Sequence, residues 1–447
     1  MRKSSKPLSF VYQTTLILAL LLLLDSGSAN AQQPSVTNRP VDPGPRLGPA
    51  GAGLPFSTLS SADLVAFNAG QDSFTEVEAV PNGLGPRFNA DSCGGCHAQP
   101  AIGGSSPSVN PQFAAASRLG AHNLIPAFIT QNGPVREARL RRNPDGSAAG
   151  GVVALFTIAG RADALGCTAT QPNFDQLLRG NNLTFRIPTP VFGSGLMESI
   201  PDAALVANLA SNGQAKNNVG IRGRLNTSGN DGTITRFGWK AQNKSLLIFA
   251  GEAYNVEEGI TSELFPNERD NIPGCMFNGT PENYTGTGAA TAVLSWADII
   301  QFTNFMRGLA PPTPAAATDS TTRGSQVFVQ VGCAMCHTPV LTSGASSHAS
   351  LSNQPVRLYS DLAIHHMGQG LDDAVSQGSA GTDEFRTAPL WGVGKRLFLL
   401  HDGRAANLLD AIAAHASQGS ESTQVINAYN ALQTSQKQDL INFLRSL

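Results

Sequence analysis

The sequence predicts a mainly α-helical protein with irregular loops and some β-structure, organised around two related segments. Three observations support this prediction. The pentamer Cys-x-x-Cys-His occurs at 93–97 and again at 333–337. Amphipathic helical patterns lie near both pentamers, and 46 glycines and 28 prolines indicate a large share of loop. The repeated pentamer therefore predicts two domains of related type, of which the N-terminal one is the more elaborated.

The N-terminal segment 1–31 has the pattern of a secretory signal peptide. Residues 2–6 carry positive charge, residues 16–24 form an apolar core, and residues 29–31 give an Ala-x-Ala cleavage pattern. An uncleaved membrane anchor is the alternative, although this apolar run is short for a membrane span. We expect cleavage, export to the periplasm and no stable membrane insertion.

The charge of the chain gives no reason to expect a nucleic-acid partner. Lysines and arginines number 30 against 32 acidic residues, so the net charge is −2. One basic run, at 136–142, is expected to be a solvated strand face, with a docking patch as the alternative.

In the N-terminal part, the pattern predicts an extended Pro/Gly-rich arm over 32–56 and a capped helix over 60–74. The region 100–290 mixes turn signals with short β-like runs, such as 151–159 and 245–250.

An amphipathic helix is expected within 294–312, followed by a linker at 313–322. We place a domain boundary near residue 315, so that the two domains span 32–315 and 316–447. A helix enters the second pentamer, and two helices close the chain within 422–447.

The two pentamers are typical of covalent haem attachment. In a helical turn, residues i, i+3 and i+4 share one face, so two thiols can form thioethers to a haem while the adjacent imidazole binds its iron. A thioredoxin-like redox pair does not require the histidine, and a zinc site would leave it surplus. We therefore predict two cytochrome c-like domains with two covalently bound haem c groups, one held by Cys93, Cys96 and His97 and the other by Cys333, Cys336 and His337.

The remaining cysteines of the six are Cys167 and Cys275. Because export places them in an oxidising compartment, we expect them to form a disulfide. Two buried free thiols are the alternative. In the chain-entropy model, closing a loop of about 108 residues stabilises the fold by about 4–5 kcal/mol.

Several stretches of the chain resemble the dihaem oxidoreductase family, some members of which are called thiol oxidoreductase-like. The family is similar to the bacterial dihaem cytochrome c peroxidases and to the dihaem enzyme that matures methylamine dehydrogenase. Only the two pentamers are strong signals alone, but the stretches are specific together. They are 83–104, 193–202, 236–266, 327–339, 359–371 and 385–416.

The resemblance implies a division of labour between two haems. The C-terminal haem would be six-coordinate and relay electrons, and the N-terminal haem would keep an open position for hydrogen peroxide. A small soluble cytochrome c or cupredoxin would donate the electrons. Bacterial relatives often bind calcium between the haems and dimerise, so the resemblance allows calcium and a homodimer here, although the sequence holds no self-contained calcium loop.

His415 is the first candidate for the sixth ligand of the C-terminal haem. It ends an apolar stripe with Leu408 and Ile412, so its imidazole would point inward. The related peroxidases carry Met or Tyr at this position, and His in place of Met should lower the reduction potential. A structural core histidine is the alternative. The rival ligands are Met367, which ranks second, and the adjacent His365 and His366.

The sequence offers no sixth ligand for the N-terminal haem, as expected for a catalytic haem. Cleavage of a bound peroxide needs a general acid–base group above the iron. Glu198 is the first candidate, because apolar residues flank it ahead of a helix start at Pro201, and burial there would raise its pKa. A surface glutamate is an equal alternative. Glu252 is a weaker catalytic candidate, and His122 is expected to be structural.

Trp391 and Trp239 are candidates to carry an electron between the haems, although a core position is the commoner role for Trp. Arg404 could pair with a haem propionate, because guanidinium binds a carboxylate through two parallel hydrogen bonds. An arginine in a turn is the alternative.

Together these features predict an exported dihaem c-type oxidoreductase of peroxidase type, which reduces hydrogen peroxide or a related oxidant. One alternative is an electron-transfer dihaem cytochrome with two six-coordinate irons and no substrate. The other is an oxidase of a protein or of an organic or sulfur substrate. A disulfide between Cys167 and Cys275 would leave no free pair for thiol exchange.

Overall fold

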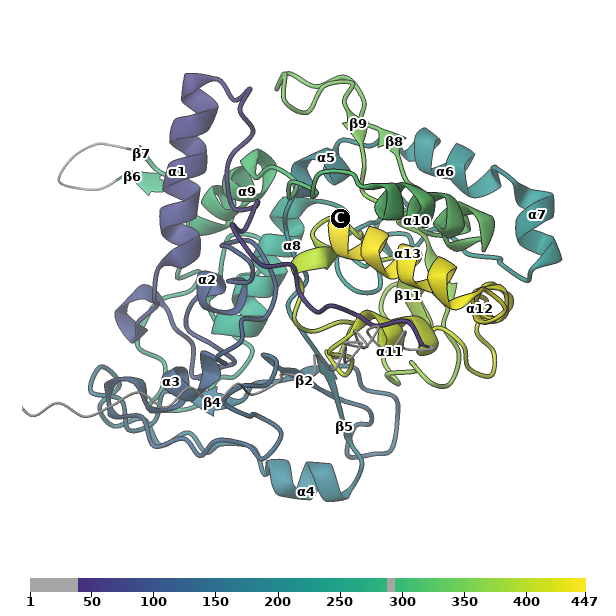
Figure 1. Cartoon of the computed structure of the whole chain (residues 1–447). Helices are drawn as coiled ribbons and strands as arrows, with labels where there is room; N and C mark the ends of the chain where they lie inside the picture. Colours follow the sequence, from purple (N-terminus) through teal and green to yellow (C-terminus); the bar gives the residue numbers. More distant parts are fainter. Residues whose placement is uncertain (1–38, 288–293) are drawn as a thin grey trace, which may run out of the picture. The chain divides into compact units, whose positions relative to one another are not determined.

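The computed structural model describes residues 39–287 and 294–447, in which short strands and long loops connect many helices (Figure 1). Arg39–Leu447 is one compact unit. The predicted signal peptide at 1–31 lies outside the described residues. Among the helices that are described, none has the length and apolar character needed to cross a membrane. The mixture of helix and short strands agrees with the predicted fold class.

The first long helix, α1 (Ser61–Thr75), packs along α9 (Asp298–Gly308). Ser60 caps α1, because its hydroxyl accepts a hydrogen bond from the backbone N–H three residues later at 3.1 Å. Gly70 lies where the helices cross, since a Cβ atom there would approach a backbone carbonyl oxygen of α9 to 2.2 Å. The pair can therefore pack this closely only with glycine at that position.

The C-terminal half repeats this arrangement with α10 (Asp319–Gln330) and α13 (Thr434–Ser446), which lie side by side in Figure 1. Thr318 and Thr321 form a reciprocal capping box at the start of α10. Gly324 lies at the crossing, where a Cβ atom would approach a backbone carbonyl oxygen of α13 to 2.0 Å. Each half thus contains a pair of packed helices with a glycine at the crossing.

Each pentamer follows the first helix of such a pair. The first forms the one-turn helix α2 (Cys93–Cys96), and the second forms the 3-10 turn η4 (Cys333–Met335). In both, the backbone N–H of the histidine donates to the backbone carbonyl oxygen of the first cysteine, at 3.0 Å for His97 and 2.9 Å for His337. The helical turn that haem attachment requires is thus present in both segments.

The other helices and helical turns are short. They are η1 (Val80–Asn82), α3 (Gln112–Ser117), η2 (Arg118–Gly120), α4 (Phe174–Arg179), α5 (Ser194–Glu198), α6 (Asp202–Ala210), α7 (Gly213–Asn218), α8 (Leu246–Ala253), the π-helical turn η3 (Tyr254–Glu258), η5 (Val393–Lys395), α11 (Leu408–Ala413) and α12 (Thr423–Asn430).

The strands form small antiparallel sheets. One has the order β3-β2-β5, and the others are the pairs β1-β4, β10-β11, β6-β7 and β8-β9. The strands are β1 (Arg87–Phe88), β2 (Glu137–Leu140), β3 (Val152–Val153), β4 (Phe156–Thr157), β5 (Leu183–Arg186), β6 (Gly286–Thr287), β7 (Leu294–Ser295), β8 (Leu341–Thr342), β9 (Pro355–Val356), β10 (Ile364–His366) and β11 (Glu384–Arg386).

Most of the elements expected from the sequence are present, with two corrections. The helix predicted at 60–74 is confirmed, and the one predicted within 294–312 is present as the shorter α9. The β-like run at 245–250 is helical instead, because Ser245 caps α8 by accepting from the backbone N–H of Ile248. The basic run at 136–142 is no solvated face, since its Arg139 is 7% exposed.

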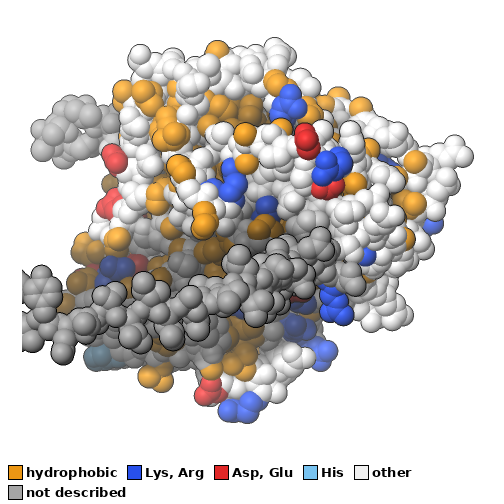
Figure 2. All heavy atoms as spheres, viewed as in Figure 1, with side chains coloured by type: hydrophobic (Ala, Val, Ile, Leu, Met, Phe, Trp, Pro, Cys, Tyr) orange, Lys and Arg blue, Asp and Glu red, His pale blue; other side chains and the backbone are white. Residues whose placement is uncertain are grey.

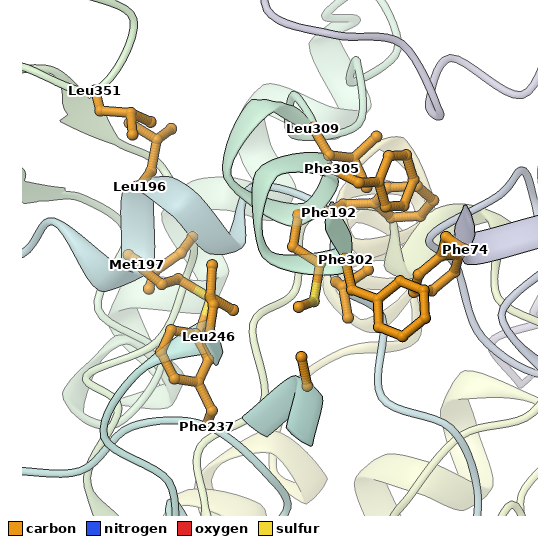
Figure 3. Close-up of a cluster of buried hydrophobic side chains, with 14 of the residues drawn as sticks. Phe74, Phe192, Leu196, Met197, Phe237, Leu246, Phe302, Phe305, Leu309 and Leu351 are labelled. Carbon is orange, nitrogen blue, oxygen red and sulfur yellow. The ribbon is translucent and has the colours of Figure 1, made fainter. Parts of the chain in front are cut away.

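The largest cluster of buried apolar side chains lies among α1, α5, α8 and α9 (Figure 3). It also takes in side chains from beyond the predicted boundary, which falls in the loop between α9 and α10. In Figure 3 Leu351 lies beside Leu196 of α5. The contributors after residue 315 are Leu341, Leu351, Val356, Leu358, Leu362 and Trp391.

Two more of the buried apolar clusters are large. One lies around β1, β2 and β4, and it includes the disulfide between Cys167 and Cys275, as predicted. The other lies among α10, α11, α12 and α13. On the face drawn in Figure 2, charged side chains are few among uncharged ones, as expected of a chain with 14% charged residues.

Candidate functional site

Each pentamer opens onto its own cavity. The first cavity has a volume of about 160 Å³ and is lined by Cys93, Cys96 and His97. The second has a volume of about 210 Å³ and is lined by Cys333, Cys336 and His337. In both cavities apolar side chains make up most of the wall, with a few charged groups placed among them. The structure therefore brings together each set of attachment residues that the sequence predicts.

Both pentamer histidines are prepared to bind a metal through Nε2. The Nδ1 atom of His97 lies 2.9 Å from the carbonyl oxygen of Gly104, and that of His337 lies 2.9 Å from that of Tyr359. A proton on Nδ1 fixes the tautomer in which Nε2 carries the free lone pair. Burial lowers the pKa of both imidazoles to about 4, so both are neutral at pH 7.

In the second cavity, His415 faces His337. The ring centroids lie 6.4 Å apart, and the Nδ1 atom of His415 lies 2.7 Å from the carbonyl oxygen of Ala411. A metal–imidazole bond is about 2 Å long, and the ring centre lies about 1 Å further, so two imidazoles on opposite sides of one metal have centroids about 6 Å apart. The spacing fits a bis-histidine metal site.

Of the rival ligands, Met367 lines the second cavity and remains a candidate. His365 and His366 are placed less favourably. Both ring nitrogens of His365 already have partners. Its Nε2 lies 3.0 Å from Asp361 and its Nδ1 lies 2.8 Å from Glu421. His366 is half exposed, pairs with Asp383 and does not line the cavity.

Two buried guanidiniums in the wall of the second cavity have nitrogen atoms without a partner. These are Nη1 of Arg386 and both Nε and Nη2 of Arg396. Among the described residues no carboxylate pairs with either. Burial lowers both pKa values to about 10, which still leaves two cations at pH 7. A buried cation without a counter-ion is costly, so this wall fits a ligand that carries carboxylates, as haem does.

Arg404, the arginine that the sequence singles out for this role, is placed elsewhere. It is exposed, its Nε pairs with Asp402, and its Nη1 donates to the carbonyl oxygen of Gly370 at 2.8 Å. It lines neither cavity. The alternative expectation, that Arg404 is an arginine in a turn, therefore describes it better than the propionate role.

The first cavity has a different chemical character, because glutamates line it. Glu137 of β2 and Glu257 of η3 share a hydrogen bond. Burial raises the pKa of Glu257 well above its ordinary value. The same burial would raise that of Glu137, but the neighbouring Arg139 and the bond from Glu257 lower it to about 2. The pair therefore holds one proton, on Glu257, at neutral pH.

Glu198 is not brought to this cavity. Its carboxylate accepts from Nε of Arg307 at 2.6 Å and from the backbone N–H of Leu246 at 2.9 Å, so it ties α9 to the start of α8. Glu252 does line the cavity and accepts from the side-chain amide of Asn243. His122 lines neither cavity.

The π-helical turn η3 explains why adjacent glutamates reach the same wall. Glu257 and Glu258 both line the first cavity, and Gly259 ends the turn with φ at +73°. π-Turns inside helices are rare and recur at functional sites. Glu258 lies with its Oε1 atom 3.1 Å from the sulfur of Cys93, and burial raises the pKa of this carboxyl well above its ordinary value.

Another buried carboxyl, that of Glu78, lies behind this wall. Glu78 is 4% exposed and accepts a hydrogen bond of 2.7 Å from the hydroxyl of Tyr254, the first residue of η3. Burial raises the pKa of Glu78 to about 7, and the carboxylates of Glu76 and Asp298 add to the effect. No sequence pattern pointed to this group.

Trp239 lies between the cavities and lines both. Its indole N–H donates to the carbonyl oxygen of Ile187 at 2.9 Å, which fixes the ring. Trp391 lines neither cavity and belongs to the main core, where its ring lies against Gly193. Of the two tryptophans named from the sequence, only Trp239 is placed between the cavities.

Sequence reasoning missed several residues that line the cavities. Glu137 and Glu257 stand in "REARL" and "NVEEG", where nothing separates them from surface glutamates. Arg386 and Arg396 were inside a resembling stretch but carried no pattern of their own. His401 lines the second cavity, with its ring stacked 4.3 Å from that of Phe385.

Comparisons with solved structures found distant likenesses. Hydrazine synthase from Kuenenia stuttgartiensis is 18% identical over 34% of this chain, with a TM-score of 0.22, and the chain spans 57% of its length. The diheme peroxidase BthA from Burkholderia thailandensis is 15% identical, over 58% of this chain and 86% of its own, with a TM-score of 0.28.

A MauG-like protein associated with microbial copper homeostasis is 17% identical, over 50% of this chain and 77% of its own, with a TM-score of 0.28. None of the curated proteins compared with the chain matches it.

The sequence model of one family, described as "Di-haem oxidoreductase, putative peroxidase", matches residues 142–447. The matched part includes the second pentamer, His415 and both unpaired arginines, and it begins after the first pentamer. Because it covers more than half of the sequence, the chain belongs to the di-haem oxidoreductase family.

Proposed function

We propose that the protein is an exported c-type di-haem enzyme that reduces hydrogen peroxide or a related oxidant in the first cavity. Electrons would arrive through the haem of the second cavity from a small soluble cytochrome c or cupredoxin. The observation that carries this proposal is the difference between the cavities. A second imidazole faces His337, whereas among the described residues the wall around His97 offers a pair of glutamates that shares a proton.

The pentamers would hold the two haems covalently. Cys93 and Cys96 would form thioethers to the first haem, and Cys333 and Cys336 to the second, within the proposed domains 32–315 and 316–447. When bound, a haem supplies an iron that can bind and reduce peroxide or pass on single electrons. Arg386 and Arg396 would pair with the propionates of the second haem, which would satisfy their unpartnered nitrogens.

The glutamate pair supports proton transfer in the first cavity. Reduction of one hydrogen peroxide to two waters consumes two electrons and two protons. Glu137, as the ionised member, would accept the proton from one peroxide oxygen, and Glu257 would donate its proton to the other oxygen as the O–O bond breaks. Two carboxyls whose pKa values are driven apart by their surroundings suit this division of roles.

Trp239 would lie on the route of the electrons. Its ring is part of both cavity walls, and the aromatic ring of His401 lies 6.4 Å from it on the side of the second cavity. These rings would provide a short path between the two sites. Replacement of Trp239 by Phe should slow electron transfer between the haems and leave their spectra unchanged.

Electron paramagnetic resonance of the oxidised and half-reduced protein, before and after addition of hydrogen peroxide, tests the proposal. We expect a low-spin signal from the haem at His337 and His415 and a high-spin signal from the haem at His97 that peroxide consumes. Two low-spin signals indifferent to peroxide in every state would instead identify an electron-transfer cytochrome. Loss of the peroxide reaction in Glu257→Gln, with spectra unchanged, would locate the proton transfer.

A further inference from the structure

Residues 39–56, the described part of the predicted N-terminal arm, contact α11, the helix that ends just before His415. Asp42 of the arm accepts a hydrogen bond of 2.6 Å through Oδ2 from the backbone N–H of Leu408, the first residue of α11. The two residues are separated by 366 positions in the sequence. His415 follows the last turn of α11, so one end of this helix contacts the arm and the other presents the imidazole.

Asp42 also binds α13, the last helix of the chain. Arg445 donates from Nε to Oδ1 and from Nη2 to Oδ2 of Asp42, each at 2.7 Å, and both side chains are almost fully buried. A bidentate pair of this kind fixes orientation as well as distance. Through its two oxygens, Asp42 therefore joins the arm to α11 and α13 at once.

A second set of contacts ties the arm to Arg396. The ammonium of Lys395 donates to the carbonyl oxygens of Leu47 and Gly48, each at 3.0 Å. The backbone N–H of Arg46 donates to the carbonyl oxygen of Gly394 at 2.7 Å. The same arm therefore contacts both α11 and the segment around Arg396, whose guanidinium has unpartnered nitrogens.

We infer that the arm acts as a clamp on the second cavity, with Asp42 as a positioning residue that keeps His415 on the metal opposite His337. The inference rests on the ligand role proposed for His415. Helix α11 has six residues, and so short a helix has little stability of its own. Its position therefore depends on its anchors, and Asp42 supplies a charged one at the end remote from His415.

If Asp42 positions His415, loss of Asp42 should raise the rate at which His415 dissociates from the iron. An external ligand such as cyanide can bind the ferric C-terminal haem only after His415 dissociates, so its binding rate reports the hold on this imidazole. We expect Asp42→Ala to raise that rate at least about tenfold, because a charge-assisted anchor of α11 is lost. Asp42→Glu keeps the charge and should restore part of the slow binding.

Removal of Asp42 also leaves the buried guanidinium of Arg445 without its counter-ion, which lowers stability in general. The double variant Asp42→Ala/Arg445→Met removes that effect, because it replaces the ion pair by apolar atoms. If the clamp positions His415, the double variant still binds cyanide fast although its unfolding midpoint recovers. Asp439→Asn is the matched control, since it breaks the pair of Asp439 with Arg323 between α10 and α13 and leaves α11 untouched.

Each outcome has one meaning. His415→Ala identifies the kinetic phase of the C-terminal haem, because that phase must become fast in it. If His415→Ala accelerates binding and Asp42→Ala does not, the clamp is overturned while the ligand assignment stands. If His415→Ala changes neither the low-spin signal nor cyanide binding, the ligand assignment and the clamp both fail.

Discussion

Replacing Glu78 by Gln should change how the stability of the protein depends on pH. Glu78 is buried behind the first cavity, and its folded-state pKa is about 7 against an ordinary value of 4.5. Below pH 4.5 the carboxyl is neutral in the folded and the unfolded chain, and its burial as a neutral group adds no pH-dependent cost. Between pH 4.5 and 7 the unfolded chain releases this proton while the folded chain retains it, so stability falls as pH rises.

The size of the effect follows from the same two values. The difference between 4.5 and about 7 corresponds to about 3 kcal/mol of unfolding free energy, lost mainly as the pH rises from 4.5 to about 7. Glutamine cannot ionise, and its amide oxygen can still accept from the hydroxyl of Tyr254. Glu78→Gln should therefore exceed the stability of the wild type by less than about 1 kcal/mol at pH 5 and by up to about 3 kcal/mol above pH 7.

Urea unfolding of both proteins from pH 5 to pH 8.5 measures this difference directly. Asp72→Asn is the matched control, because Asp72 lies in the preceding helix, is exposed and is not one of the carboxylates that act on Glu78, so its removal should leave the pH dependence almost unchanged. Parallel stability curves for wild type and Glu78→Gln would refute the reasoning. Such a result would mean that Glu78 is already ionised in the folded protein at pH 5.

Three further predictions concern the cavities and the helix pairs. Glu257→Gln should slow the reaction with peroxide about 100-fold or more, measured by stopped-flow absorbance, because the proton donor is lost. Glu252→Gln, which alters the same wall at a group bound to Asn243, should change that rate only a few-fold, and equal losses would contradict the assignment. Arg396→Met should lower the reduction potential of the C-terminal haem in a potentiometric titration, because a buried cation disfavours the more positive ferric state; an unchanged potential would place the propionates elsewhere. Gly324→Ala should destabilise the fold by about 1–3 kcal/mol or more in urea, because its Cβ meets a carbonyl oxygen of α13 at 2.0 Å, whereas Gly213→Ala, with open space around it, should not.

The candidate haem-attachment residues could be proposed from the sequence because they lie close together in it. Two thiols and an imidazole within five residues are the pattern typical of haem attachment, and the helical turn that brings them together is short. His415 could be proposed as a ligand for a similar reason, since the apolar stripe that it forms with Leu408 and Ile412 lies within eight residues of the sequence.

The pair of buried glutamates in the first cavity could not be predicted in this way. Glu137 and Glu257 come from β2 and η3, and only the packing of a strand against a π-turn brings them together. The apolar neighbours of Glu198 in the sequence suggest a buried catalytic carboxyl. Its carboxylate instead forms an ion pair with Arg307 of α9, which is remote in sequence. Propensity also failed at 245–250, where a capping serine outweighed the β-like composition of the run.

The core drawn in Figure 3 also limits how this protein can be divided or recombined. Side chains from both sides of residue 315, such as Leu196 and Leu351, share one buried cluster. A fragment of residues 316–447 produced alone would expose the apolar side chains that it contributes to that cluster, and it would tend to aggregate. Exchange of one half for that of a relative would require compensating changes across the same surface. The two halves are therefore matched to each other across this core and are not independent modules.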